Sequence, residues 1–166
     1  MDAIQVLKQQ HQEVKQLFEQ CKSLGERAFK SREAIAQQTC EKLTIHDRLE
    51  HDVFYPAVMQ VQEGKGEVLE GLEEHHLIKI MLKQISDMEA SEETYNAKLT
   101  VLEELVLHHV QEEEEKMFPL ATSSLGKDQL DALGRQLTDL TSELEGQEPE
   151  VTITMLDQVS LETESI

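Results

Sequence analysis

The sequence contains few residues that interrupt helices or crosslink a chain. Its 166 residues include three prolines, seven glycines, two cysteines and no tryptophan. Because proline and glycine are the strongest local breakers of regular structure, their scarcity favours long helices. Two cysteines are too few for a disulfide-rich secreted scaffold, so we expect Cys21 and Cys40 to be free thiols in a cytoplasmic protein.

Basic residues are also scarce. The chain has 15 Lys and Arg against 34 Asp and Glu, which gives a net charge of -19. This balance argues against nucleic acid, whose phosphates require Lys and Arg, and against anionic membrane surfaces. No apolar run reaches transmembrane length, and residues 2–20 are amphipathic rather than signal-like. We expect a soluble cytoplasmic monomer or homodimer, large enough to bury its own core.

Apolar residues recur at spacings of three, four and seven, which are typical of amphipathic helices. At the start of the first helix, Asp2 and Gln5 form the pattern of a capping box. Ser91 has the side chain of an N-cap and is expected to open the fourth helix. The five segments with helical spacing are residues 2–25, 31–56, 66–85, 91–119 and 128–144.

Glycine and proline mark the expected ends of these segments. Gly25 closes the first, and Gly64 with Gly66 indicates a turn in the middle of the chain. Pro56 and Pro119 should bend or end the second and fourth helices, because proline lacks an N–H and clashes with the carbonyl four residues back. Four amphipathic helices with short connections predict an all-α, antiparallel up-and-down four-helix bundle.

We divide the chain into two parts on this basis. Residues 1–125 should form the four-helix bundle, and residues 126–166 an additional C-terminal helix with an acidic tail. The tail after Gly146 reads as an appendage to the bundle.

The most informative feature is an internal repeat. His46 is followed by a Glu at position 50 and a Pro at position 56, and 63 residues later His109, Glu113 and Pro119 repeat this spacing. His11 matches His75 at nearly the same offset. The repeat predicts two similar helical hairpins related by a pseudo-twofold axis.

The repeated residues are polar, yet they lie on apolar stripes. A His and a Glu at positions i and i+4 lie on one helix face about 6 Å apart along the axis, so both point to the same place in the core. Imidazole combined with carboxylate suits iron, manganese, zinc or copper, whereas calcium and magnesium prefer oxygen alone. We therefore predict a metal site built by His11, His46, Glu50, His75, His109 and Glu113.

Other histidines compete for the same role. His76 lies on the stripe of Lys79 and should face solvent, although it could serve as a further ligand. His51 lies about 100° from its neighbour Glu50 and is expected to be exposed or to support a ligand. His108 repeats the ligand spacing with Glu112, but only the spacing from Glu113 to proline matches the first half of the chain.

Three further assignments concern the surroundings of the site. Tyr55 could approach the metals from a bent helix end, but packing with an exposed hydroxyl is the simpler interpretation. Glu112, Glu114 and Glu115 are expected to form a solvated face. Glu74, beside His75, could support a ligand.

Taken together, these motifs resemble the hemerythrin-like His-His-Glu (HHE) cation-binding family over about residues 1–120. The resemblance rests on His11, His46-x-x-x-Glu50 with Phe-Tyr-Pro, Glu74-His75, and His109-x-x-x-Glu113 with Met-Phe-Pro. It implies two non-haem iron ions inside a four-helix bundle, bridged by both glutamates and by an oxo or hydroxo group. The histidines would complete the coordination.

The chain departs from the oxygen-carrying hemerythrins, which have a fifth His one turn along the third helix. Here the positions four residues from His75 are Gly71 and Lys79. An open position favours reactivity over stable O₂ carriage. We expect a protein that binds, senses or stores O₂ or iron. The alternatives are an enzyme acting on peroxide or nitric oxide, and a metal-switched interaction protein acting through its C-terminal segment.

Overall fold

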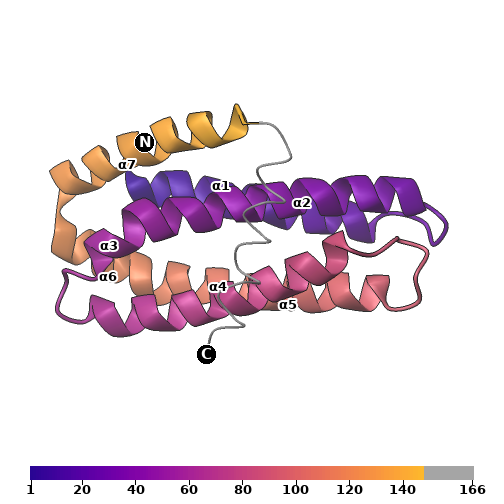
Figure 1. Ribbon diagram of the computed structural model, residues 1–166. Helices are drawn as coiled ribbons and strands as arrows, with labels where there is room; N and C mark the ends of the chain where they lie inside the picture. Colours follow the sequence, from indigo (N-terminus) through magenta and orange to yellow (C-terminus); the bar gives the residue numbers. More distant parts are fainter. Residues whose placement is uncertain (148–166) are drawn as a thin grey trace.

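The computed structural model describes residues 1–147, which form helices and short connections (Figure 1). The helices are α1 (Ala3–Lys22), α2 (Phe29–Leu49), η1 (Glu50–Phe54), α3 (Tyr55–Val58), α4 (Gly64–Ser86), α5 (Tyr95–Glu112), η2 (Glu113–Met117), α6 (Phe118–Leu125) and α7 (Lys127–Glu145). Within this part of the chain, no helix combines the length and the apolar character needed to cross a bilayer.

Four long helices lie side by side as two hairpins, α1 with α2 and α4 with α5 (Figure 1). Helix α7 lies across the outer side of α1 and α2. The all-α bundle with an additional C-terminal helix is therefore confirmed. The tail after Gln147 lies outside the described residues, and the division of the chain at residue 125 stays a prediction.

The first helix begins where the sequence predicts. The side chain of Asp2 accepts a hydrogen bond from Gln5 N at 2.9 Å, and the side chain of Gln5 accepts one from Asp2 N at 3.0 Å. This reciprocal capping box satisfies two donors that a helix start would otherwise leave without partners.

Two of the predicted boundaries are wrong. Ser91 does not cap a helix: α5 begins at Tyr95, after Thr94, because residues 89–94 form turns instead. Gly64 and Gly66 do not form a turn and belong to the first turn of α4. Gly64 is required for packing, because a Cβ there would lie 1.9 Å from the carbonyl oxygen of Val58.

Neither Pro56 nor Pro119 ends its helix. Each follows a wide π-helical segment, η1 or η2, in which a backbone N–H bonds to the carbonyl five residues earlier. Tyr55 N–H donates to Glu50 O, and Phe118 N–H donates to Glu113 O. Because the next residue is a proline without an N–H, the α-helical bonding pattern cannot continue unchanged, and the extra residue of a π turn absorbs the change.

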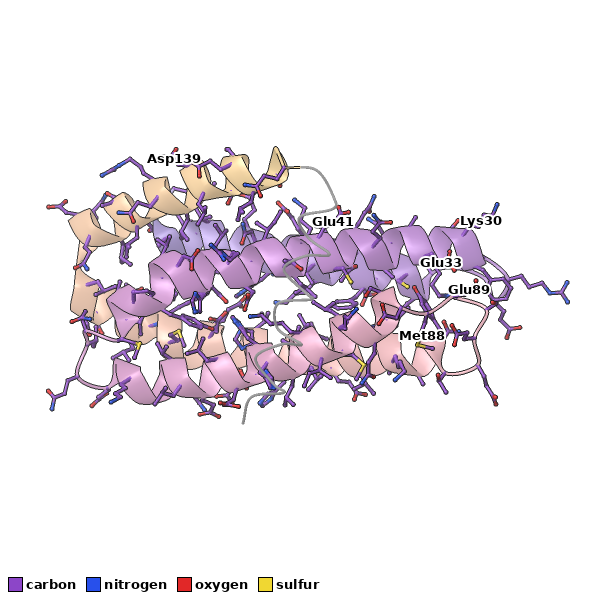
Figure 2. All side chains as sticks on the ribbon, viewed as in Figure 1. Lys30, Glu33, Glu41, Met88, Glu89 and Asp139 are labelled. Atoms are coloured by element: carbon purple, nitrogen blue, oxygen red, sulfur yellow. The ribbon has the colours of Figure 1, made fainter. Side chains whose placement is uncertain are left out.

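The hydrophobic core consists of two clusters on either side of a polar layer. One cluster lies at the end that carries α3, α6 and α7, and the other lies toward the α1–α2 and α4–α5 loops. At that second end, Glu33 accepts a hydrogen bond from Ala90 N at 2.8 Å (Figure 2). Cys21 and Cys40 are free thiols, as predicted.

Helix α7 approaches the start of α1 so closely that only glycine fits at position 134. A Cβ there would lie 2.4 Å from the carbonyl oxygen of Met1 and 2.9 Å from Ala3 N. Gly134→Ala should therefore destabilise the protein by about 1–3 kcal/mol in urea unfolding, despite the better helix propensity of alanine.

Gly66→Ala provides the matched control, because a Cβ at this helical glycine meets no heavy atom within 4 Å. It should be neutral or stabilising by up to about 1 kcal/mol. An equal response of both variants would contradict the tight packing of α7 on α1.

Candidate metal centre

The structure brings all six predicted ligands into the polar layer between the two hydrophobic clusters. None is more than 5% exposed. Helices α1 and α4 each supply one His, while α2 with η1 and α5 with η2 each supply a His and a Glu. The residues are His11, His46, Glu50, His75, His109 and Glu113.

The six residues form two groups that share Glu50. In the first, His11, His46, Glu50 and Glu113 have ligand atoms within 4.8 Å of one another. His11 Nε2 lies 3.2 Å from both His46 Nε2 and Glu113 Oε2, and His46 Nε2 lies 3.0 Å from Glu50 Oε1. In this first group, nitrogen and oxygen atoms thus converge on one point.

The second group consists of Glu50, His75 and His109. The Nε2 atoms of His75 and His109 lie 2.8 Å apart, and His75 Nε2 lies 3.1 Å from Glu50 Oε2. Glu50 therefore turns one carboxylate oxygen to each group. Glu113 Oε2 lies 3.5 Å from His109 Nε2, but Glu113 belongs to the first group only.

The buried carboxylates of Glu50 and Glu113 indicate whether metal ions fit between the six residues. Both oxygens of Glu50 and Oε2 of Glu113 are buried and accept no hydrogen bond, although each faces an imidazole nitrogen at 3.0–3.2 Å. Burying charge without a partner is costly, so buried carboxylates are normally paired or coordinate a metal. The facing imidazole nitrogens complete a donor set that suits iron, manganese or zinc. The residues present therefore fit two metal cations.

The outer nitrogen of every imidazole faces an oxygen. His11 Nδ1 lies 2.9 Å from Glu114, and His109 Nδ1 lies 2.6 Å from Glu74. Such contacts fix the orientation of each imidazole. They also make the ring a more basic donor for a metal ion at the inner nitrogen. The expectation that Glu114 belongs to a solvated face is wrong, whereas Glu74 supports a ligand as expected.

Two of these supporting residues were not found from the sequence. Gln10 Oε1 lies 2.8 Å from His46 Nδ1, and Asp47 Oδ1 lies 2.9 Å from His75 Nδ1. All four supporting residues precede or follow a ligand directly in the chain. Since one residue is about 100° of helix rotation, each reaches sideways to the His of a neighbouring helix. This adjacency is the signal that could have identified them.

Tyr55 also belongs to the centre, and the prediction of an exposed hydroxyl is wrong. The side chain is 2% exposed, and its ring stacks on His75 with centroids 5.4 Å apart. The hydroxyl donates to Glu113 Oε1 at 3.0 Å and lies 3.3 Å from His75 Nε2. Gly71 makes room for it, because a Cβ there would lie 2.8 Å from the hydroxyl oxygen.

The π turn explains the position of Tyr55. In an α-helix the fifth residue after Glu50 would lie about 140° around the axis, away from the centre. In η1 the bond from Tyr55 N to Glu50 O brings the fifth residue back over the first. The same turn in η2 stacks Phe118 on His11 at 5.6 Å. At this position the two halves thus differ by one hydroxyl group.

The other three histidines stay outside the two groups of ligand atoms. His51 is exposed and contacts Asp52 at 2.8 Å. His108 is exposed and lies 3.3 Å from Glu74. His76 is half-buried on α4, one residue beyond His75. The structure therefore favours His109 over His108, as the spacing to Pro119 predicts.

Without metal, the centre holds charge by mutual pairing. Burial alone would lower the pKa of His75, but its contacts with Asp47 and Glu50 outweigh burial and raise this pKa to about 9. Burial opposes the charged carboxylate of Glu50, yet the surrounding imidazoles, His46 foremost, hold the pKa of Glu50 well below its usual range. The metal-free centre should therefore contain imidazolium–carboxylate pairs.

This pairing predicts a pH dependence that metal should abolish. His75 has a pKa of about 9 when folded and 6.5 as a free side chain, so its stabilisation is complete below pH 6.5 and is lost as the pH rises through 9. Chelator-treated protein should lose on the order of 3 kcal/mol of unfolding free energy between these values. Urea unfolding of the chelator-treated protein at pH 6.5 and at pH 9 measures this loss.

The metal-loaded protein provides the comparison. Ligating imidazoles are already neutral, so its stability should not fall over the same pH interval. Parallel losses in the metal-free and the metal-loaded protein would show that these histidines do not bind metal.

A cavity of about 200 Å³ reaches the centre from one side. All four ligand histidines line it, whereas Glu50, Glu113 and Tyr55 do not. Its edge is formed by polar residues of α2 and α4, including Arg48 and Lys79. Small molecules can therefore approach the imidazoles through a space that Tyr55 does not line.

Two known proteins are similar to this chain. A DNA nickase from Nostoc sp. is 29% identical over 92 residues, but the match covers 55% of this chain and only 26% of that protein. A crystal structure of a hemerythrin HHE cation-binding domain-containing protein from Mycobacterium kansasii has a TM-score of 0.78, with 23% identity and 88% of both chains covered. This likeness shows the fold.

The family is shown by a broader match. The model of the hemerythrin HHE cation-binding domain matches residues 2–121, which include all six converging His and Glu residues. The match spans most of the chain and ends before α7 begins at Lys127. This chain belongs to the hemerythrin HHE cation-binding domain family.

Proposed function

We propose that the protein holds two iron ions and that this centre binds or senses O₂, or stores iron, in the cytoplasm. One observation carries the proposal: two groups of buried ligand atoms share Glu50, which turns one oxygen to each. A single structural metal would not require a duplicated donor set. Iron held in this way supplies one-electron and O₂ chemistry at a site that side chains shield from bulk water.

The proposed ligands fall into two sets. His11 and His46 would hold one ion and His75 and His109 the other, and Glu50 belongs to both groups of ligand atoms. Glu113 reaches the first set directly and lies near His109. The supporting oxygens on the outer nitrogens orient every ring, so the geometry does not depend on the metal alone.

A second candidate is an enzyme that consumes peroxide or nitric oxide. Tyr55 favours it, because its hydroxyl places a buried O–H donor within 3.3 Å of one set of ligands. Burial, reinforced by Glu50 and Glu113, raises the pKa of Tyr55 well above its usual value, so the phenol keeps its proton in the metal-free protein. The interaction-protein alternative assigns partner binding to about the last forty residues, of which residues 148–166 lie outside the described part of the chain.

Metal analysis with optical titration tests the proposal. Protein purified without chelator should contain two iron ions per chain, and azide should shift the absorption of the ferric form. Exposure of the ferrous form to O₂ should then give rapid oxidation rather than a long-lived adduct, since no fifth His is present. Stable, reversible oxygenation would favour carriage. Catalytic loss of peroxide or nitric oxide would favour the enzyme, and one zinc per chain would refute the di-iron proposal.

A further inference from the structure

The cavity beside the four imidazoles is larger than a diatomic gas requires. Its volume is about 200 Å³. A water molecule occupies about 30 Å³ of liquid, and an apolar cavity of about 150 Å³ is enough to bind benzene in another protein. The space next to this centre therefore suits a small organic molecule of about six non-hydrogen atoms.

The cavity wall away from the imidazoles is aliphatic. The side chains that form it all belong to the second hydrophobic cluster and come from α1, α2, α4 and α5. They are Val14, Leu43, Ile78, Leu82, Val106 and Val110. Such walls favour a compact hydrocarbon body, because they offer apolar contacts and no hydrogen-bonding group.

The opposite end of the cavity favours an anionic group. Four imidazoles line this end, and the two buried carboxylates would neutralise only part of the charge of two metal cations. The edge of the cavity carries Arg48 and Lys79, which pair with Asp52 at 2.7 Å and Asp47 at 2.9 Å. Because these two cations are already paired, the attraction for a negative head group comes from the metal ions.

We propose that this cavity is a binding site for short, branched aliphatic monocarboxylates. The carboxylate lies toward the four imidazoles, and the hydrocarbon body packs among the six aliphatic side chains. This inference rests on the proposed function, because the metals attract the head group. A carboxylate in this place occupies the side from which O₂ approaches, so the two ligands compete.

The test compares acetate with isobutyrate on ferric, metal-loaded protein. Both carboxylates present the same head group, and isobutyrate adds two methyl groups. Titration calorimetry and the shift of the ferric absorption bands should show isobutyrate binding at least about tenfold more tightly, the usual effect of added apolar groups in a matching pocket. Equal affinities would overturn the proposal.

Two variants of α5 provide a matched pair. Val106→Phe fills the cavity and should abolish the preference for isobutyrate. Val101→Phe makes the same change at a position that is 40% exposed, and it should keep the preference. Loss of the preference in both, or in neither, would contradict the assignment of the cavity.

Two controls separate this inference from the proposed function. If the protein holds no iron pair and azide does not bind, the proposed function fails. If azide binds but the size of the carboxylate has no effect, only the aliphatic site fails.

Crystals of the unsubstituted protein under xenon give a readout that needs no variant and no metal. Xenon should occupy the space between Leu82 and Val106, and its absence there would also overturn the proposal.

Discussion

Glu50→Ala should leave the chain without either metal ion. Glu50 is the residue that both groups of ligand atoms share, with Oε1 3.0 Å from His46 Nε2 and Oε2 3.1 Å from His75 Nε2. Its removal leaves each ion with imidazoles and at most one carboxylate. Metal analysis after gel filtration should fall from two ions per chain to none.

The neighbouring glutamates give a graded comparison. Glu113→Ala should retain at most one ion, because Glu113 completes the first group but not the second. Glu112→Ala should retain both, because this side chain is only half-buried and pairs with Lys116 outside the centre. Loss of metal from Glu112→Ala with retention in Glu113→Ala would reverse the assignment of the helix face.

Metal loss should also lower thermal stability. A ligand present at about a thousand times its dissociation constant stabilises the folded state by about 4 kcal/mol. For a protein of this size that corresponds to a fall of about 10 °C in Tm. Glu50→Ala should melt at the same temperature with and without added iron, whereas Glu112→Ala should keep the full response to metal.

Tyr55→Phe should weaken metal retention while the fold is kept. The substitution removes only the hydroxyl, and with it the hydrogen bond to Glu113 Oε1 at 3.0 Å. Hydrogen bonds to charged groups contribute about 1.5–3 kcal/mol, so chelator competition should show an affinity at least about tenfold lower. If the phenol binds ferric iron directly, a visible absorption band should disappear as well.

Two variants make this prediction specific. Tyr95→Phe is the matched control, because Tyr95 is also 2% exposed but lies in the second hydrophobic cluster, away from the ligands. Gly71→Ala should reproduce the effect of Tyr55→Phe, because its Cβ would displace the hydroxyl. Normal metal affinity in both Tyr55→Phe and Gly71→Ala would exclude a role for the phenol at the centre.

Much of the fold follows from the sequence because its signals are local. The capping box of Asp2 and Gln5 and the helical spacing of apolar residues involve neighbours within one helix. The grouping of the six His and Glu residues needed one further signal, the repeat, which gives each residue a counterpart in the other half. Their assignment as ligands remains a prediction, but the structure brings together the same six residues.

The errors arise where the backbone leaves α-helical geometry or where distance between helices matters. An exposed Tyr55 hydroxyl is the simpler prediction from the sequence, but the π turn brings position 55 back over Glu50. For Glu114 the sequence predicts a place on a solvated face. Its partner, His11, belongs to a different helix.

The sequence by itself determined the helix content, the two equivalent halves and the residues able to bind metal, because these depend on spacing along the chain. Only the tertiary structure decided which oxygen holds each imidazole, where the Tyr55 hydroxyl lies and how much space remains beside the centre. Those properties depend on how side chains from four helices pack at one level of the bundle. Shifts of a few ångströms between helices change them while leaving every spacing in the sequence unaltered.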